Sequence, residues 1–248
     1  MNEKKKSTNF PRIYYNQFLE INTLIILDKK IKHYIVNVLR RKIGDLITIF
    51  NNTNYIYYSK ITNIQKNKIT IHIIKKQEEN NESPIRIHLI QIISKKEKMH
   101  FTIEKSVELG VSTITPIISD QPIRYCLKKK IKYWNNVIIS SCAQSKRNIL
   151  PKLYQPKKLN EWNKTVSSEE IKIYFHRKSN NKINQIQNKN LKNIYLIIGP
   201  EKGFSKHEME YMNKKSFLSI SLGPRILRTE TAAITAITSV QILLGDIT

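Results

Sequence analysis

Hydrophobic residues follow a strand-like pattern over the first third of the chain. Short apolar or alternating runs occur at residues 24–28, 45–52, 55–64 and 68–76. In the last run, Ile69, Ile71 and Ile73 share one face. Only residues 30–42 have helical spacing, and Gly44 follows as a stop signal. Several short strands with one helix predict a small β-barrel.

The pattern changes after residue 84. Strand-length apolar runs occupy residues 85–94, 111–118, 171–175, 194–198 and 220–222. Helical spacing occupies residues 94–109, 128–147, 205–215 and the chain from 229 onward, with possible capping boxes at Ser94–Glu97 and Ser205–Glu208. Such alternation predicts a parallel α/β sheet. The acidic, proline-ended segment 77–84 separates the two patterns, so we predict domains at 1–76 and 85–248 joined by a linker at 77–84.

Two of the late apolar runs end in Gly-Pro, at Gly199 and at Gly223, and three of the six glycines lie in these two loops. Glycine is used where backbone turns sharply or approaches another group closely. The run at 171–175 ends in His176-Arg177 and brings a third strand end to the same region. Loops at the carboxyl ends of neighbouring strands form a pocket in open α/β sheets. From spacing alone, a pair of ordinary strand-to-helix turns remains an equal alternative.

Charged and hydroxyl side chains crowd these loops. Glu201 follows the first Gly-Pro, and the second is followed by Arg225, Arg228, Thr229, Glu230 and Thr231. Charges between a buried strand and an apolar helix need partners. This favours a functional pocket over two plain turns.

The charge balance points to a polyanionic partner. Lys and Arg exceed Asp and Glu by 43 − 19 = 24, which favours nucleic acid, although a composition rich in Lys, Asn and Ile is typical of A+T-rich coding and accounts for part of the lysine. Cys126 and Cys142 indicate neither a disulfide framework nor a metal cluster, and the histidines lack zinc-site spacing. No Rossmann, P-loop or GxSxG motif occurs. With no long apolar run, we expect a cytoplasmic protein without a membrane partner.

The two loops carry a resemblance. IGPEKGFS (198–205) and LGPRILRTETA (222–232) closely resemble the paired signature loops of the bacterial 16S ribosomal RNA (uracil-N3)-methyltransferases of the SPOUT superfamily. Further matching segments are PRIYY (11–15), HYIVNVLRRKIGD (33–45), EKMHFTIEKSVELGVSTITP (97–116) and CAQSKRN (142–148). Together they cover most of the chain in order.

The resemblance implies a fold, a cofactor and a target. The first domain would be a PUA-like β-barrel that holds RNA, and the second a SPOUT α/β domain whose C-terminal chain forms a trefoil knot. S-adenosylmethionine (SAM) would bind in the knot of an obligate homodimer, without a metal. The substrate would be one uridine of 16S rRNA in the decoding region of the small ribosomal subunit.

The resemblance also implies site residues. Cofactor contacts would come from Phe175, His176, Gly199, Pro200, Glu201, Gly203, Leu222, Gly223, Ile226, Leu227, Arg228, Thr229, Thr231 and Ala232. Catalysis would involve Arg225, Arg228, Glu230 and Glu201. RNA would contact Arg12, Arg40, Arg41, Gln144 and Arg147.

The chemistry suits these side chains. Either arginine would hold phosphate or stabilise the uracil anion that forms when the N3 proton leaves. Glu201 or Glu230 would favour the cationic cofactor, and both are candidates for the general base. For Arg228, an ion pair with Glu230 is an equal alternative.

Two residues depart from the family pattern. Lys202 stands where the family usually has Gly, and a side chain there would crowd the loop or restrict its backbone. Ala143 stands where the family tends to have Glu. These departures motivate an alternative, a non-catalytic RNA-binding or ribosome-assembly protein that retains the fold.

Overall fold

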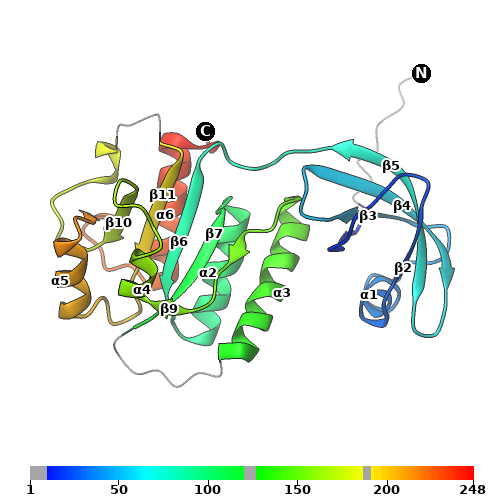
Figure 1. Ribbon diagram of the computed structural model, residues 1–248, viewed down its shortest axis with the longest axis horizontal. Coiled ribbons are helices and arrows are strands. Elements are labelled where there is room, and N and C mark those ends of the chain that lie inside the picture. Colours follow the sequence, from blue (N-terminus) through cyan, green and yellow to red (C-terminus); the bar gives the residue numbers. More distant parts are fainter. Residues whose placement is uncertain (1–9, 120–126, 187–190) are drawn as a thin grey trace. The chain divides into compact units, whose positions relative to one another are not determined.

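The chain forms two compact units in a computed structural model that describes residues 10–119, 127–186 and 191–248. The first unit comprises the described chain up to Asn81 together with Lys146–Ile149. The second comprises Glu82–Ser145 and Leu150–Thr248. The predicted class, a small β domain followed by a parallel α/β domain, is confirmed (Figure 1).

The first unit is built on a five-stranded sheet with the order β1-β3-β4-β5-β2. The strands are β1 (Arg12–Tyr14), β2 (Leu24–Leu27), β3 (Leu46–Phe50), β4 (Tyr55–Ile64) and β5 (Ile69–Glu78). β1 runs parallel to β3, and the other pairs are antiparallel. Since β1 and β2 do not pair within the described residues, the barrel is incomplete. β5 also continues two residues into the predicted linker.

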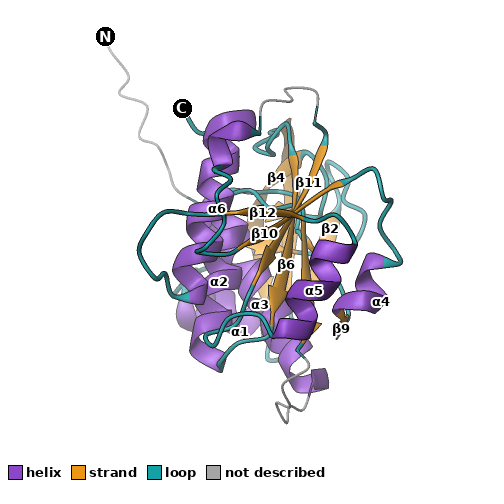
Figure 2. Cartoon of the chain, turned by 90° about the vertical axis from the view of Figure 1, so that its left-hand side faces the viewer, coloured by secondary structure: helices purple, strands orange, loops and turns teal. Residues whose placement is uncertain are grey.

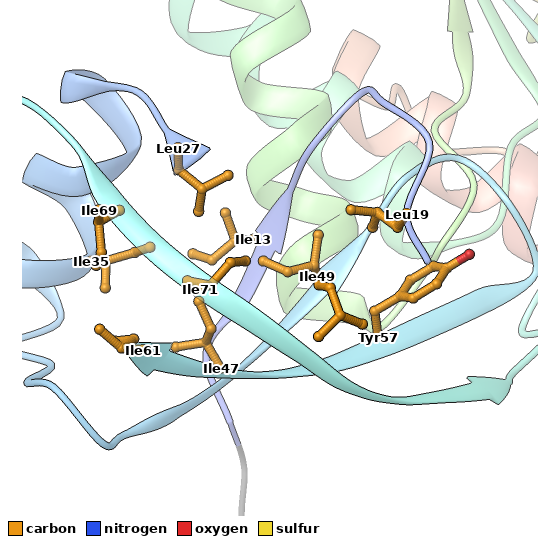
Figure 3. Packing of buried hydrophobic residues seen from close by; sticks show 11 residues of the cluster. Ile13, Leu19, Leu27, Ile35, Ile47, Ile49, Tyr57, Ile61, Ile69 and Ile71 are labelled. Carbon is orange, nitrogen blue, oxygen red and sulfur yellow. The ribbon is translucent and has the colours of Figure 1, made fainter. Parts of the chain in front are cut away.

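Isoleucine fills the core of this unit. Ile69, Ile71 and Ile73 are fully buried, which confirms the face predicted from their alternation. Ile71 lies opposite Ile61 on β4, and Figure 3 shows these side chains converging with Ile47 on one side of the sheet. Complete burial of each side chain contributes about 2 kcal/mol before entropy is counted.

The predicted helix at 30–42 is only partly correct. It begins as α1 (Lys29–His33), capped by the Asp28 carboxylate, and continues as the π-helix η1 (Tyr34–Val38). Arg40 then adopts a left-handed backbone conformation with φ of 54°, which no helix continues through. The helix therefore ends before the two arginines.

The second unit contains a seven-stranded, wholly parallel sheet. Its main order is β12-β10-β11-β6-β7-β8, and β9 pairs with β7. The strands are β6 (Arg86–Ile92), β7 (Thr113–Ile118), β8 (Lys152–Leu153), β9 (Lys157–Lys158), β10 (Ile171–Phe175), β11 (Asn193–Ile198) and β12 (Leu218–Ile220). The helices are α2 (Lys96–Glu108), α3 (Leu127–Ser145), α4 (Leu159–Asn163), the 3₁₀ helix η2 (Ile183–Gln185), α5 (Lys206–Lys214) and α6 (Thr229–Leu244).

Helices cover both faces of this sheet (Figure 2). On one face α2 packs between α3 and α6. On the other, Trp162 of α4 and Met212 of α5 pack with buried strand residues such as Ile90 and Ile197. Because both faces are covered, the strands are continuous apolar runs rather than alternating ones.

Local details differ from the sequence prediction in three places. The N-cap of α2 is Lys95, so no capping box forms at Ser94–Glu97, whereas the box at Ser205–Glu208 is present. β12 ends at Ile220 instead of beginning there. The short strands β8 and β9 and the helix α4, which lie between the predicted helix at 128–147 and the predicted strand at 171–175, were not predicted. No helix in the described ranges is long and apolar enough to cross a membrane.

Gln241 anchors the C-terminal half of α6. Its side chain is buried, its Nε2 donates to the Leu109 carbonyl oxygen over 2.7 Å, and its Oε1 accepts from the Ser83 hydroxyl over 2.8 Å. These bonds join α6 to the end of α2 and to the start of the second unit. They fix the helix whose first turn faces the candidate site.

We therefore expect Gln241→Leu to lower the free energy of unfolding by about 1–3 kcal/mol, because the Leu109 carbonyl oxygen loses its side-chain donor and the Ser83 hydroxyl loses its acceptor. Both tryptophans, Trp134 and Trp162, are buried in the second unit, so urea unfolding followed by tryptophan fluorescence reports on it. Ser83→Ala breaks one of the two bonds and should cost less. Equal stability of Gln241→Leu and the wild type would contradict this role.

Candidate active site

A cavity of about 320 Å³ lies at the carboxyl ends of β10 and β11, beneath the loop from β12 to α6. This volume is within the range of small-molecule sites, roughly 300–1,000 Å³. The lining residues are Phe175, His176, Arg177, Ile198, Gly199, Pro200, Glu201, Lys202, Gly203, Phe204, Leu222, Gly223, Arg225, Ile226, Leu227, Thr229 and Ala232.

The three segments predicted from the sequence thus meet in one cavity. Of the residues assigned to the cofactor, all but Arg228 and Thr231 line it. Arg228 is the N-cap residue of α6 and Thr231 lies in its first turn, and both are exposed. The strand order explains the meeting, because β10 pairs with both β11 and β12 and all three run in parallel.

The glycines of these loops serve different needs. Gly223 has φ of 107° and no atom within 4 Å of an added Cβ, so its backbone conformation, not space, requires glycine. At Gly199 an added Cβ would lie 3.3 Å from the Phe204 ring, so space is the constraint. The loop at Gly199 therefore packs against an aromatic ring, whereas the loop at Gly223 makes a sharp turn where it lines the cavity.

Lys202 fits its loop without strain. It is exposed, and it is not among the non-glycine residues with positive φ; the left-handed conformation falls on Gly203, with φ of 76°. Gly203 N–H closes the turn by donating to the Pro200 carbonyl oxygen over 2.9 Å. The backbone at position 202 therefore does not demand glycine.

A buried hydroxyl joins the two Gly-Pro loops. Thr229 Oγ1 donates to the Gly199 carbonyl oxygen over 2.5 Å and accepts from Gln91 Nε2 over 3.2 Å. Gln91 Nε2 also donates to the Ile92 carbonyl oxygen over 2.8 Å, and both side chains are buried. The sequence prediction missed Gln91. The sequence did contain a signal, because Gln91 is a single amide inside a buried apolar strand, and a buried amide needs a polar partner.

Two arginines follow Gly223 in the chain, and they differ in position. Arg225 is exposed and lines the cavity, and no carboxylate of the described chain forms an ion pair with it. Arg228 is the N-cap residue of α6. The alternative ion pair between Arg228 and Glu230 is not formed in the described structure. Arg225 is therefore free to meet an anion at the cavity.

The two glutamates also differ. Glu201 lines the cavity, accepts from Lys95 N–H over 3.2 Å and lies 3.6 Å from Lys98 Nζ. Burial alone would raise its pKa, but hydrogen bonds from its own N–H and that of Lys95, together with Lys98, outweigh burial and hold the pKa below its ordinary value. Glu230 does not line the cavity, and its buried Oε2 has no hydrogen-bond partner within the described chain.

The residues assigned to RNA are not equally accessible. Arg40 and Gln144 are exposed and Arg41 is half-buried. Arg147 is only 3% exposed, and Arg12 Nη2 donates to Asn148 Oδ1 over 2.6 Å. Arg12 and Arg147 therefore help to hold the first unit together. A role in RNA binding stays a prediction for all five.

The described residues hold no group of three His, Cys, Asp or Glu side chains that could bind a metal ion. Cys142 is buried, and Cys126 lies outside the described residues. The polar side chains that line the site are His176, Arg177, Glu201, Lys202, Arg225 and Thr229.

Comparisons with known proteins agree with this geometry. Residues 81–241 match the family model described as an RNA methyltransferase domain, and residues 27–74 match an RNA methyltransferase PUA domain. The chain is 49% identical over 241 residues to Ribosomal RNA small subunit methyltransferase E of Buchnera aphidicola subsp. Schizaphis graminum, covering 96% of this chain and 98% of the relative.

Two solved structures share the whole fold. A Legionella pneumophila protein in complex with the bound cofactor SAM has a TM-score of 0.91 and 36% identity, covering 96% of this chain and 99% of that one. Ribosomal RNA small subunit methyltransferase E of Neisseria gonorrhoeae, bound to S-adenosyl methionine, has a TM-score of 0.90 and 34% identity, covering 96% and 100%.

The Thr229 bridge gives a testable prediction. Thr229→Val keeps the side-chain shape, but it leaves the Gly199 carbonyl oxygen without this donor and removes one of the two hydrogen bonds of Gln91 Nε2, at a cost of about 1–3 kcal/mol. Thr231→Val makes the same change at an exposed position in the same turn and should cost far less. Urea unfolding of both variants measures the difference. Equal losses would show that the bridge contributes nothing specific.

Proposed function

From the premise that this chain belongs to the RNA methyltransferase family that includes the Ribosomal RNA small subunit methyltransferase E proteins, we propose that it methylates N3 of a uracil in 16S rRNA. The methyl donor is S-adenosylmethionine, which two proteins of the same fold hold in their structures. The target we propose is one uridine in the decoding region of the small subunit. The resemblance of the two Gly-Pro loops supports this finer assignment.

The cavity suits the cofactor. Its volume is at the lower end of small-molecule sites, and it lies where parallel strands end, the usual place for a ligand in an open α/β sheet. Gly199 and Gly223 bring main-chain groups to its wall, and Leu222 and Leu227 offer apolar surface. When bound, the cofactor supplies an electrophilic methyl group on a sulfonium centre.

Glu201 places a carboxylate in a cavity wall that Arg177, Lys202 and Arg225 also line. Because its pKa is held below the ordinary value, its carboxylate stays ionised at neutral pH and favours a cationic ligand electrostatically. The same property makes it a weak base. We therefore assign Glu201 to cofactor binding and not to removal of the uracil proton.

Arg225 is suited to the acceptor. Uracil N3 becomes nucleophilic when it loses its proton, and the resulting negative charge needs a fixed cation nearby. Arg225 lines the cavity without an ion-pair partner in the described chain, so its guanidinium is available for this charge. This unpaired arginine in the wall of a cavity of about 320 Å³ is the observation that carries the proposal.

For the general base we propose Glu230. Its buried Oε2 accepts no hydrogen bond from the described residues, and it lies one residue beyond Thr229, which lines the cavity. Glu230 itself does not line the cavity. The target uracil would therefore have to approach along the first turn of α6 to reach the Glu230 carboxylate.

Lys202 gives the RNA-binding alternative less support than its departure from the family pattern suggests. Its backbone conformation does not require glycine, although its exposed side chain lines the cavity. Ala143 remains a departure, but it lies on α3 and does not line the cavity. The trefoil knot, the homodimer and the domain boundaries predicted above stay part of the proposal on the strength of the resemblance.

The test is methyl transfer from labelled SAM to small subunits that lack the modification, followed by nucleoside analysis for 3-methyluridine. We expect the wild type to form it. Arg225→Ala should lower kcat by roughly 10²-fold while SAM affinity changes little, because Arg225 acts on charge that develops during the reaction. Arg86→Ala, which removes an exposed arginine at the opposite end of the sheet, should leave kcat unchanged.

If SAM binds but no 3-methyluridine forms on any RNA of the small subunit, the proposed reaction is wrong and the RNA-binding alternative takes its place. If 3-methyluridine forms equally well with Arg225→Ala, the reaction stands and the role of Arg225 is wrong.

A further inference from the structure

A second cavity, of about 480 Å³, adjoins the first. Both are lined by Arg177, Leu222 and Gly223, so a wall of three residues separates them. The second cavity extends from this wall along the loop that follows β10 and over one face of α6.

The outer wall of this cavity is held in place by hydrogen bonds. Ser221 N–H donates to the Asn181 carbonyl oxygen over 2.9 Å, and Lys182 forms a parallel bridge with Ser221. Ser179 Oγ donates to the Ser219 carbonyl oxygen over 2.8 Å, and Asn181 Nδ2 donates to the same oxygen over 3.1 Å. The loop after β10 thus continues the pairing of β10 with β12. These hydrogen bonds hold the outer wall of the cavity in a defined conformation.

The charge of this cavity is wholly positive. Arg177 and Lys182 line it, and no Asp or Glu is among its lining residues. Neither cation forms an ion pair with a carboxylate in the part of the chain that the structure describes. Two unpaired cations in one hollow attract an anion, and the net charge of +24 favours a polyanionic one.

The remaining polar groups suit the backbone of RNA. Thr235 and Ser239 present half-buried hydroxyls from α6, and neither has a side-chain hydrogen bond within the described residues. Asn180 and Asn184 add exposed amides on the opposite side. Hydroxyls and amides are donors and acceptors for phosphate oxygens and for the ribose 2′-hydroxyl.

We propose that the second cavity binds the phosphate and ribose groups of the RNA strand beside the target nucleotide. This rests on the proposed function and locates its substrate. With the first cavity assigned to the cofactor, the second cavity, which shares three lining residues with it, is a neighbouring place for the RNA strand. Gly223, which has no side chain, is one of the residues that line both cavities.

Two lysines of the same loop test this site. Lys182 lines the second cavity alone, whereas Lys178 is exposed in the same loop and lines neither cavity. Lys182→Ala should raise KM for the small subunit several-fold with little change in kcat or in SAM affinity. Lys178→Ala removes the same charge and should change KM much less. Similar changes in both variants would overturn the site, because they would reflect net charge alone.

A binding measurement keeps the test independent of catalysis. The probe is a short fluorescein-labelled oligouridylate, titrated with each protein at several salt concentrations and followed by fluorescence anisotropy. Loss of one phosphate contact makes the slope of log affinity against log salt shallower by about 0.7 for a single strand. We expect this change in Lys182→Ala and not in Lys178→Ala. If the wild type transfers no methyl group, the proposed reaction fails, yet this comparison still decides whether the cavity binds RNA.

A second copy of the chain could occupy the second cavity instead of RNA. Light scattering on Lys182→Ala separates these two outcomes, because an unchanged molecular mass supports the RNA site. A change of oligomeric state in Lys182→Ala, with an unchanged salt slope, would show that the cavity belongs to an interface between copies and would overturn the proposal.

Discussion

The hydrogen bond from the Thr229 hydroxyl to the Gly199 carbonyl oxygen is the constraint on which the site depends. It connects the end of β11 to the first turn of α6, and Gln91 extends the connection to β6. Without it, the two Gly-Pro loops would be separate turns at the edge of a sheet. With this hydrogen bond, the ends of three strands and the first turn of α6 line one cavity. At the other end of the same helix, the buried bonds of Gln241 fix its direction.

The charges around this frame separate by function. The first cavity carries one carboxylate, Glu201, which favours a cationic cofactor, beside three basic side chains, Arg177, Lys202 and Arg225. The adjoining cavity carries cations only. In the proposed methyl transfer, the sulfonium donor would therefore meet a carboxylate, and the anionic RNA acceptor would meet cations. The protein supplies fixed charges and shape, and the cofactor supplies the reactive carbon.

Much of this arrangement could be predicted from the sequence, and the failures have physical causes. The strand at 171–175 and the Gly-Pro loops were predicted correctly because buried parallel strands are uninterrupted apolar runs that end at turn residues. The helix at 30–42 was predicted too long because Arg40 takes a left-handed conformation that periodicity does not reveal. Gln91, the burial of Arg147 and the second cavity depend on contacts between distant segments, which local patterns do not contain.

The most direct measurement is a calorimetric titration of SAM into three proteins: the wild type, Gly223→Ala and Gly44→Ala. Both glycines have positive φ, 107° and 95°, and open space around an added Cβ, so the two substitutions impose similar backbone strain. Only Gly223 lines the cavity. The account predicts that the wild type and Gly44→Ala bind SAM alike, whereas Gly223→Ala binds it at least about tenfold more weakly, equivalent to about 1.4 kcal/mol. Equal binding by all three proteins, or no binding by the wild type, would contradict the assignment of this cavity to the cofactor.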